Sequence, residues 1–499
     1  MKTRNLGLGL FVLLATSTAG FAAATEGEAA SILASIQSYV GAEPGVVTVT
    51  PDGDGYDIAF DAMPYLKKIT EKGFTAKVDT YHFKAVPQGN GLWAVTSSAP
   101  FAASASVPDI FSFAMESPKV EWNGTYNDAL FAFMDSNYSI SNMSISQTQT
   151  DKNTKIVSKG ATVIESMIGK GTATDTGNGF VDSDGTLTFS GLVSSTTMEM
   201  PPEMVQAGMP NINYVANMTK GVYTTTAKGL SSKPLMEVAA FFVSHPTKEL
   251  IIKDQAVLKE KLLATLPFFA ALQSDGTFEN LSVDTSYGKF AMAGGGSKVG
   301  LSGAVKEGRV AEGFEINGLT LPDGLPLPPW SKGLIPTKMK IGFEVSGFDL
   351  EAPTRKFITE MDVSKEEPVP PGSEAAYLAA FAPTNGVKLT IPAGEITADL
   401  FSLTYEGTSD ISFAGLPKVN AKFRMTGMDK VIAQLQQAAT DQTAQQGMAM
   451  LFAAKGIGKA DGDAITWDVT MSPEGKLLVN GTDFSAMMGA LSPPPPPQQ

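Results

Sequence analysis

The amino-acid sequence predicts a mainly β protein of the α+β class, with large antiparallel, curved or barrel-like sheets and a few packed amphipathic helices. Two observations lead to this prediction. Apolar and polar residues alternate through many segments, which is the period of a strand with one buried and one solvated face. Glycine, asparagine and aspartate turn signals separate these segments, and few of them have the spacing of an amphipathic helix.

The length predicts more than one lobe. The chain has 499 residues, which exceeds what one compact core usually serves. We expect a signal peptide (1–24), an N-terminal β-rich lobe (25–235), a C-terminal β-rich lobe with helices near 247–272 and 429–455 (236–492) and a proline-rich tail (493–499). The tail has the composition of an extended polyproline II segment.

The first residues, "MKTRNLGLGLFVLLATSTAGFAAA", have the three parts of a secretory signal peptide. Lys2 and Arg4 are the positive region, Leu6 to Leu14 the apolar region, and cleavage near Ala24 is expected. A transmembrane anchor is the weaker alternative, because a spanning helix needs about 20 apolar residues. We therefore expect export, with no transmembrane segment after cleavage.

The chain contains no cysteine, so burial alone must hold an exported product together. A Gram-negative periplasm is the simplest location for such a protein. The formal net charge is −14, and without Lys2 and Arg4 it is −16. Nucleic acid and bare anionic membranes need basic patches on a protein, so this charge argues against both as partners.

The clearest strands have alternating apolar residues. In chain order they lie around Leu187 and Phe189, Leu281 and Val283, Met339 to Val345, Ala421 to Met425, and Ile465 to Met471. Hairpin turns are expected at Asp184-Gly185, Asp275-Gly276 and Glu474-Gly475, because Asp-Gly and similar pairs favour tight reversals.

Three segments predict helices: 26–41, 247–272 and 429–455. For the second, Pro246 suits a first helical position and Pro267 should end or kink the helix. For the third, Asp429 is the expected N-cap and Gly456 the expected stop.

A proline-rich stretch, "GLPLPPWSKGLIP", precedes the strand at Met339. Pro326, Pro328 and Pro329 cannot donate to a sheet ladder, so they predict a connection or a sheet edge. Trp330 is expected to cap the end of a core, with the mouth of a ligand site as the alternative. The corners Gly347-Phe348-Asp349 and Gly427-Met428-Asp429 hint at a repeated strand-and-corner unit.

The segments "HPTKELIIKDQAVLKEKLLATLPFFAALQSDGTFENLSVDTSYGKF" and "LPPWSKGLIPTKMKIGFEVSGFDL" resemble the domain of unknown function 2125 family of alphaproteobacterial envelope proteins. The match is best over about 236–350. The resemblance implies an envelope location and a mostly β architecture. It supplies no activity and no catalytic residues to carry over.

Catalytic motifs are scarce. The two histidines, His82 and His245, are far apart in the sequence, and His245 before Pro246 suits a helix start. The segment "GLSGA" around Ser302 lacks the spacing of a nucleophile elbow. The glycine-rich segment Gly169 to Gly179 lacks the dinucleotide-binding spacing and is expected to be a flexible loop. The sequence therefore indicates a non-enzymatic protein and names no catalytic or cofactor-binding residue.

Clustered aspartates are the only metal candidates. They are Asp52, Asp54, Asp57, Asp182, Asp184, Asp461 and Asp463. Calcium takes such oxygen ligands, but none of the clusters has the glycine and glutamate positions of an EF-hand. Ordinary turns are the simpler interpretation.

For function, we expect a periplasmic envelope protein that presents an apolar groove to a lipid or another hydrophobic ligand. The motivation is 28 Phe and 22 Met in an exported chain of which only 18% is charged. A structural or interaction module, which binds an envelope protein through sheet edges or the proline tail, is the second hypothesis. A periplasmic hydrolase is the third.

Overall fold

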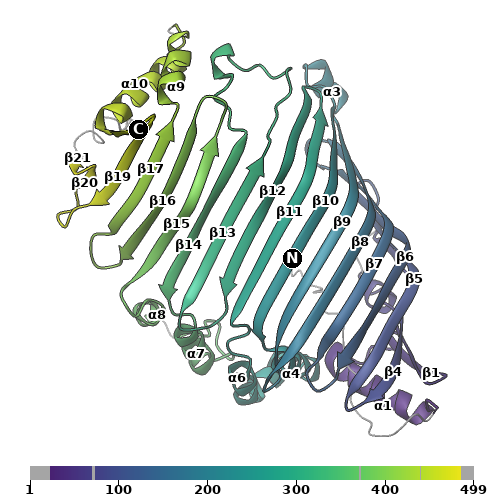
Figure 1. Ribbon diagram of the computed structural model, residues 1–499. Coiled ribbons are helices and arrows are strands. Elements are labelled where there is room, and N and C mark those ends of the chain that lie inside the picture. The colour runs from purple at the N-terminus through teal and green to yellow at the C-terminus, as the bar shows by residue number, and fades with distance from the viewer. Residues whose placement is uncertain (1–22, 70–72, 370–371, 439, 485–499) are drawn as a thin grey trace. The chain divides into compact units, whose positions relative to one another are not determined.

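The computed structural model describes residues 23–69, 73–369, 372–438 and 440–484, and they form mainly antiparallel β-structure (Figure 1). The predicted fold class is confirmed: the sheets are curved and a few helices accompany them. The expected signal peptide, apart from Ala23 and Ala24, and the proline-rich tail lie outside the described residues.

The chain forms two compact units. Unit 1 comprises Met1–Ser286 and Thr354–Ser373, and unit 2 comprises Tyr287–Pro353 and Glu374–Gln499. The lobe boundary expected between residues 235 and 236 falls inside a helix of unit 1, α4 (Ser232–Ser244).

Unit 1 contains one antiparallel sheet in which nearly every strand pairs with the next strand in the chain. The order is β1-β2-β4-β5-β6-β7-β8-β9-β10-β11, and β3 pairs with the second half of β5. The strands are β1 (Val47–Asp52), β2 (Gly55–Phe60), β3 (Thr75–Val78), β4 (Tyr81–Gly89), β5 (Leu92–Val107), β6 (Phe111–Asn127), β7 (Ala132–Thr150), β8 (Val157–Gly177), β9 (Phe180–Glu199), β10 (Ile212–Leu230) and β11 (Ala271–Thr285).

The strands of unit 2 also pair antiparallel, in the order β12-β13-β14-β15-β16-β17-β19. Short strands β18 and β20 pair with β19, and β21 pairs with β20. The strands are β12 (Gly288–Ser302), β13 (Gly308–Asn317), β14 (Lys338–Phe348), β15 (Gly386–Thr397), β16 (Ser402–Ser412), β17 (Lys418–Thr426), β18 (Lys459–Asp461), β19 (Ala464–Met471), β20 (Leu477–Val479) and β21 (Thr482–Asp483).

The helices lie at the ends of the strands (Figure 1). In unit 1 they are α1 (Glu26–Val40), α2 (Met63–Leu66), α3 (Pro202–Gln206), α4, α5 (Lys248–Lys253) and α6 (Gln255–Ala264); in unit 2 they are η1 (Pro329–Ser331), α8 (Glu374–Phe381), α9 (Met428–Gln436) and α10 (Gln442–Ile457). Helix α7 (Glu351–Glu360) begins in unit 2 and continues into unit 1. The expected helix at 26–41 is therefore present as α1.

The other two expected helices are each divided. The segment 247–272 forms α5 and α6, with Pro246 before the Thr247 cap, and it ends at Ala264 because residues 271 and 272 already pair with β10. The segment 429–455 breaks after Gln436, because the Asp441 carboxylate accepts from the backbone N–H groups of Thr443 and Ala444 and so starts α10. Asp429 lies inside α9 and Gly456 inside α10, so neither has its expected capping role.

The strands of unit 1 are longer than the sequence suggested. Asp184-Gly185 and Asp275-Gly276 lie inside β9 and β11, and most of the expected loop Gly169 to Gly179 belongs to β8. Glu474-Gly475, by contrast, lies at a turn. Gly185 lies inside a continuous ladder, opposite Gly171 and Thr225. At Gly169 the aromatic ring of Tyr138 on the neighbouring strand covers the glycine.

Four directly opposite pairs show this arrangement: Tyr138 with Gly169, Phe189 with Gly221, Phe348 with Gly308, and Tyr405 with Gly394. A Cβ atom at Gly169 would lie 2.0 Å from the Tyr138 ring, so any other residue would displace the ring. Glycines in these strands are therefore places where an aromatic ring packs, and they do not mark turns.

A line of left-handed residues crosses the sheet of unit 1. Asn142, Gly191 and Asn280 have φ of 50°, 63° and 52° in β7, β9 and β11. Directly paired apolar residues form a row on each side of this line: Ile140, Met167, Phe189, Gly221 and Phe278 on one side, and Met143, Ile164, Leu192, Met218 and Leu281 on the other. The left-handed residues interrupt the pleat, so the two rows are three positions apart instead of two.

Helix α1 packs on the sheet of unit 1 through Ile32 and Ile36, which contact a cluster that includes Tyr56, Phe83 and Trp93. Thr25 caps this helix by accepting from the Glu28 backbone N–H. A second cluster joins α4, α6, α7 and the residue after α7, through Phe241, Leu258, Ile358 and Met361. This second cluster explains why residues 354–373 belong to unit 1.

We expect Ile36→Ala to lower the free energy of unfolding of unit 1 by about 2–5 kcal/mol, because Ile36 is fully buried and its removal leaves a cavity. Urea unfolding followed by tryptophan fluorescence measures this change. Ala34→Ser, at an exposed position of the same helix, is the control and should change the value by less than about 0.5 kcal/mol. Equal effects of the two variants would contradict the packing described for α1.

Candidate functional site

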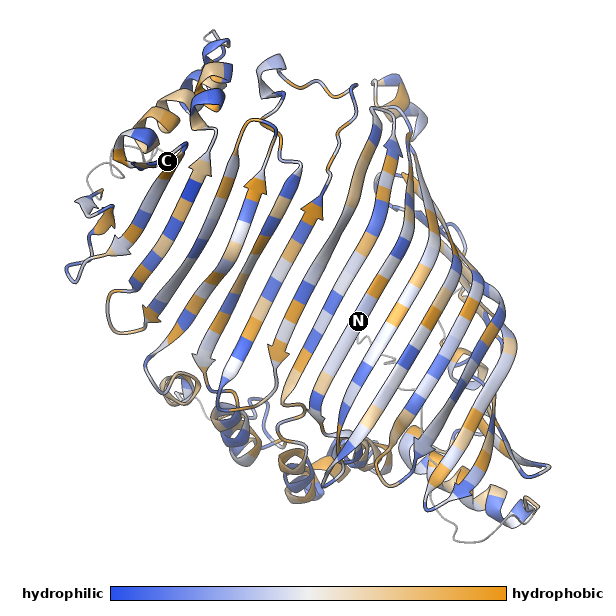
Figure 2. Ribbon diagram, viewed as in Figure 1, coloured by the Kyte–Doolittle hydropathy of each residue, from blue (hydrophilic) through white to orange (hydrophobic). Residues whose placement is uncertain are grey.

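The sheet of unit 2 has one apolar and one polar face. Met339, Ile396, Leu403, Met425 and Ile465 are directly paired across five strands. The next row along these strands, Lys340, Glu395, Thr404, Arg424 and Thr466, is paired in the same way and is entirely polar. Successive side chains point to opposite faces of a sheet. Figure 2 shows the resulting alternation along the strands.

Much of the apolar face is open to solvent. Seven of its large side chains, spread from β12 to β17, are between 36% and 45% exposed: Val299, Leu301, Phe314, Ile341, Phe343, Ile411 and Phe423. Single exposed apolar residues are ordinary, whereas a group of them on one face is typical of interaction surfaces. Phe314 and Ile341 of this set are directly opposite each other, and Glu312 lies between Val299 and Phe343.

Helices α9 and α10 cover one end of the apolar face. Val431, Ile432 and Leu435 of α9 are buried against Met425 of β17. The indole N–H of Trp467 donates to the Ala454 carbonyl at 2.8 Å, which ties β19 to α10. Helices α9 and α10, which we call the roof, are therefore fixed over this end of the apolar face.

The proline-rich connection holds the roof in place. Trp330 donates its indole N–H to the Asp441 carboxylate at 3.1 Å, and Gln434 donates its side-chain N–H to the Trp330 carbonyl at 3.3 Å. Trp330 also packs against the cluster under α9 and α10, which confirms the expected position at the end of a core. Its indole hydrogen bond, followed by those from the backbone of Ala444 and Thr443, lowers the pKa of Asp441.

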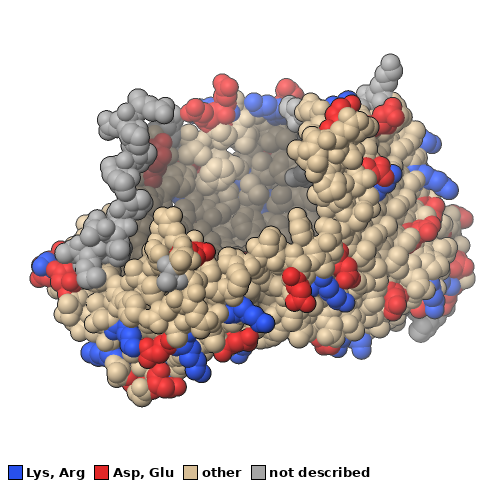
Figure 3. Space-filling model, turned by 90° about the horizontal axis from the view of Figure 1, so that it is seen from above, with Lys and Arg blue, Asp and Glu red and all other residues tan. Residues whose placement is uncertain are grey.

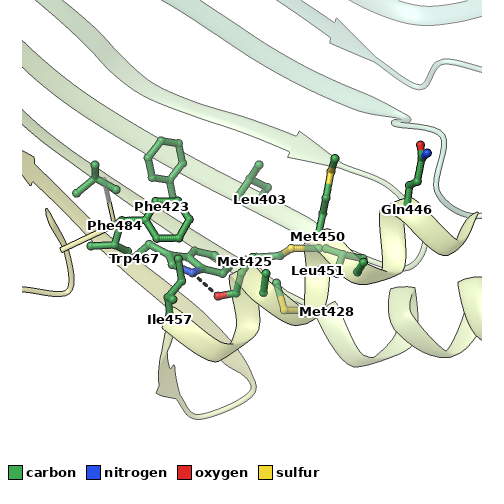
Figure 4. Close-up of a pocket in the computed structure, with 15 residues that line it drawn as sticks. Leu403, Phe423, Met425, Met428, Gln446, Met450, Leu451, Ile457, Trp467 and Phe484 are labelled. Atoms are coloured by element: carbon green, nitrogen blue, oxygen red, sulfur yellow. Dashed lines mark hydrogen bonds between the residues drawn. The ribbon is translucent and has the colours of Figure 1, made fainter. Parts of the chain in front are cut away.

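A pocket of 590 Å³ lies beside α10 on this apolar face (Figure 4). Its lining residues come from α9, α10 and four strands and from the residue that follows β21: Leu403, Phe423, Met425, Met428, Gln446, Ala449, Met450, Leu451, Ala453, Ala454, Ile457, Trp467, Val469, Val479 and Phe484. Gln446 is the single residue among them with a polar side chain apart from the indole of Trp467. The volume falls within the roughly 300–1,000 Å³ of small-molecule sites.

Unit 1 has a smaller apolar hollow of 360 Å³, lined by Tyr81, Val120, Trp122, Phe133, Ser136, Tyr138 and Ile140. Its rings pack edge to face, and the centroids of Trp122 and Phe133 are 4.5 Å apart. Burial raises the pKa of Tyr138. Because these rings also belong to or pack against the core under α1, this hollow is a weaker site candidate than the pocket in unit 2.

Ser244, His245 and Asp254 have the composition of a catalytic triad. The Ser244 hydroxyl is 2.9 Å from Nδ1 of His245, and the Asp254 carboxylate is 3.1 Å from Nε2. However, Nδ1 also lies 2.8 Å from the Phe241 carbonyl oxygen, which can only accept. Nδ1 therefore carries a hydrogen and cannot take the proton of Ser244.

This geometry gives His245 a structural role. Its ring stacks on Phe241 at 3.9 Å and follows the last residue of α4, so the histidine caps the end of that helix and joins it to Asp254. The expected role at the start of the following helix is wrong: Thr247 is the N-cap of α5, and His245 is instead the C-cap residue of α4. His82 lies on β4 and contacts the exposed Asp57 at 3.0 Å.

The candidate metal ligands are divided among other partners. Asp52 and Asp54 each lie 3.3 Å from Lys84 Nζ, and their hydrogen bonds raise the pKa of Lys84. The Gly229 backbone N–H, followed by Lys228, lowers the pKa of Asp182. The remaining contacts are Asp184 with Thr226 and Asp461 with Arg424. Within the described ranges, no three His, Asp or Glu side chains are close enough together to hold a metal ion.

Ser302 of the "GLSGA" segment exchanges hydrogen bonds with the backbone of Arg309 across the β12–β13 turn. On the view in Figure 3, acidic and basic side chains are interspersed and most of the surface is uncharged. None of the helices in the described part of the chain is both long and apolar enough to cross a bilayer.

No protein-family model, curated protein or solved structure matches the chain. The resemblance to the domain of unknown function 2125 family therefore stays a prediction. The pocket and the open apolar face are what the structure itself offers as a site. The sequence contained the alternation that builds this face, but not the pairing of β17 with β19 or the position of α10, which create the pocket.

We expect the roof over the apolar face to loosen in acid. The pKa of Asp441 is lowered in the folded chain, so its contribution to stability is present above the ordinary aspartate pKa of about 4 and is lost as the pH falls through the folded value. Asp441→Ala should lower the melting temperature of unit 2 at neutral pH and flatten this part of its pH dependence.

Melting curves between neutral and acidic pH measure the effect, with Asp410→Asn, an exposed carboxylate on the polar face, as the control. Combining Asp441→Ala with Trp330→Phe should cost less than the sum of the two single changes, since they remove the same hydrogen bond. Strict additivity would contradict the role of this bond.

Proposed function

We propose that this chain is a non-enzymatic periplasmic envelope protein that binds a lipid or another hydrophobic ligand on the apolar face of unit 2. The observation that carries the proposal is the continuity between the open apolar side chains and the pocket. Phe423 belongs to both sets: it is 36% exposed on the sheet and lines the pocket. A ligand in the pocket can thus extend onto the open face at Phe423.

The energetics support an apolar ligand. Removing apolar surface from water contributes roughly 25 cal/mol per Å². The open side chains of β13 and β14, such as Phe314 and Ile341, are paired directly with each other, so one ligand would cover several of them at once. The opposite face carries ion pairs such as Lys338 with Glu395 at 2.8 Å and suits contact with water.

Phe423→Glu should weaken the binding of an apolar fluorescent dye by about tenfold or more, because a carboxylate would replace the ring where pocket and open face meet. Asn420→Glu is the matched control: it adds the same carboxylate on the same strand, but on the polar face between Lys418 and Lys422. It should leave dye affinity unchanged. Dye titration of both purified variants measures the difference.

Native mass spectrometry of the protein purified from the envelope is the second test. A lipid-sized mass that is present in the wild type and reduced in Phe423→Glu supports the proposal. Equal dye affinity in the two variants, together with no bound lipid, overturns it. A protein retained instead by the same apolar face would favour the interaction-module hypothesis.

A further inference from the structure

We infer that the ligand which enters the pocket is a single acyl chain, with its polar head held at Gln446 and its tail directed toward Ile457. This inference rests on the proposed function and specifies the class of ligand. It follows from the shape of the pocket, from the position of its polar end and from the flexibility of its lining.

The pocket follows the axis of α10. Leu451 and six other residues of this helix line the pocket, and the six form one stripe with spacings of three or four positions: Gln446, Ala449, Met450, Ala453, Ala454 and Ile457. Eleven helical steps separate Gln446 from Ile457, which is a length of about 16 Å. A volume of 590 Å³ spread over this length gives a mean cross-section of about 37 Å². The α10 wall of the site is therefore a long apolar stripe, which suits a linear chain.

The polar group of this stripe is at one end. Figure 4 shows Gln446 at one side of the pocket, with Ile457 and Phe484 at the other. Gln446 is exposed, so its amide can donate to and accept from a head group that stays in water. No charged side chain lines the pocket, so the inserted part of the ligand must be uncharged. This complementarity selects an amphiphile with one polar end.

The lining is adaptable where the chain would lie. Met425, Met428 and Met450 contribute unbranched thioethers, and Met450 is 64% exposed. Such side chains adjust to a flexible chain and fix the shape of a rigid ring system poorly. Ala449, Ala453 and Ala454 have short side chains, so they leave room for the acyl chain beside α10.

A chain-length series tests the inference. Saturated fatty acids from octanoate to stearate, titrated against the full chain by dye displacement, should bind about fourfold more tightly for each added methylene, until the pocket is full. Beyond that length the gain per methylene should fall, because further carbons reach only the open face. Pyrene, a rigid polycycle, should bind more weakly than palmitate.

A variant that shortens the pocket gives the sharper result. Ala453→Phe places a ring four residues before Ile457 and closes about the last 6 Å of the stripe. The length at which affinity levels off should move to shorter acids, while octanoate affinity stays within about twofold. Ala453→Leu should give a smaller shift if the phenylalanine disturbs folding. Gln442 is exposed on α10 and does not line the pocket, so Gln442→Phe is the control. It should not change the chain length at which affinity levels off.

The outcomes separate this inference from the proposed function. If no fatty acid and no dye binds, both are overturned. If dye and acids bind and Phe423→Glu weakens them, but affinity does not depend on chain length, or Ala453→Phe behaves like Gln442→Phe, the acyl-chain inference fails and the proposed function stands. Tighter binding of pyrene than of palmitate also overturns the inference.

Discussion

The alternation of apolar and polar residues along the strands is the constraint on which the rest of the structure depends. In an antiparallel sheet this alternation produces one face that must leave water. In unit 1, helix α1 covers part of that face and buries Ile32, Ile36 and Trp93. In unit 2, α9 and α10 cover only the end near Met425, so that side chains such as Ile341 and Phe343 stay exposed. The proposed binding surface is therefore the part of this apolar face that no helix covers.

Glycine allows the long strands to carry so many aromatic residues. Tyr138 and Phe189 lie directly opposite Gly169 and Gly221, where a Cβ atom would approach the rings to about 2 Å. A glycine in a strand ordinarily weakens it, because it packs nothing and loses more conformational entropy. Here the ring of the neighbouring strand supplies the missing contact. Residue pairs, and not single residues, are therefore what stabilises these sheets.

These pairs also show how far the sequence could predict the fold. The mainly β class and helix α1 follow from local period and capping, and both are present. The interior glycines could not be interpreted locally: Gly185 and Gly276 suggested turns, but they pair with Thr225 and Tyr223 of β10, and the local sequence does not reveal these pairings. Left-handed residues such as Asn142 and Asn280 add an extra position to the alternation and obscure strand length.

The site was predictable in kind but not in place. An abundance of Phe and Met indicated an apolar surface, yet the pocket needs Leu403, Ala453 and Trp467 to meet from three elements. Trp330 links this surface to the proline-rich connection, since its indole and carbonyl bind Asp441 and Gln434. Pro328 is the N-cap of the short helix η1 and Pro329 is its first residue. Neither can donate to a ladder, so they keep this connection out of the sheet, where it can reach α9 and α10. The proline-rich connection therefore has a structural role. It holds α9 and α10 over one end of the apolar face, and the rest of that face stays open to solvent.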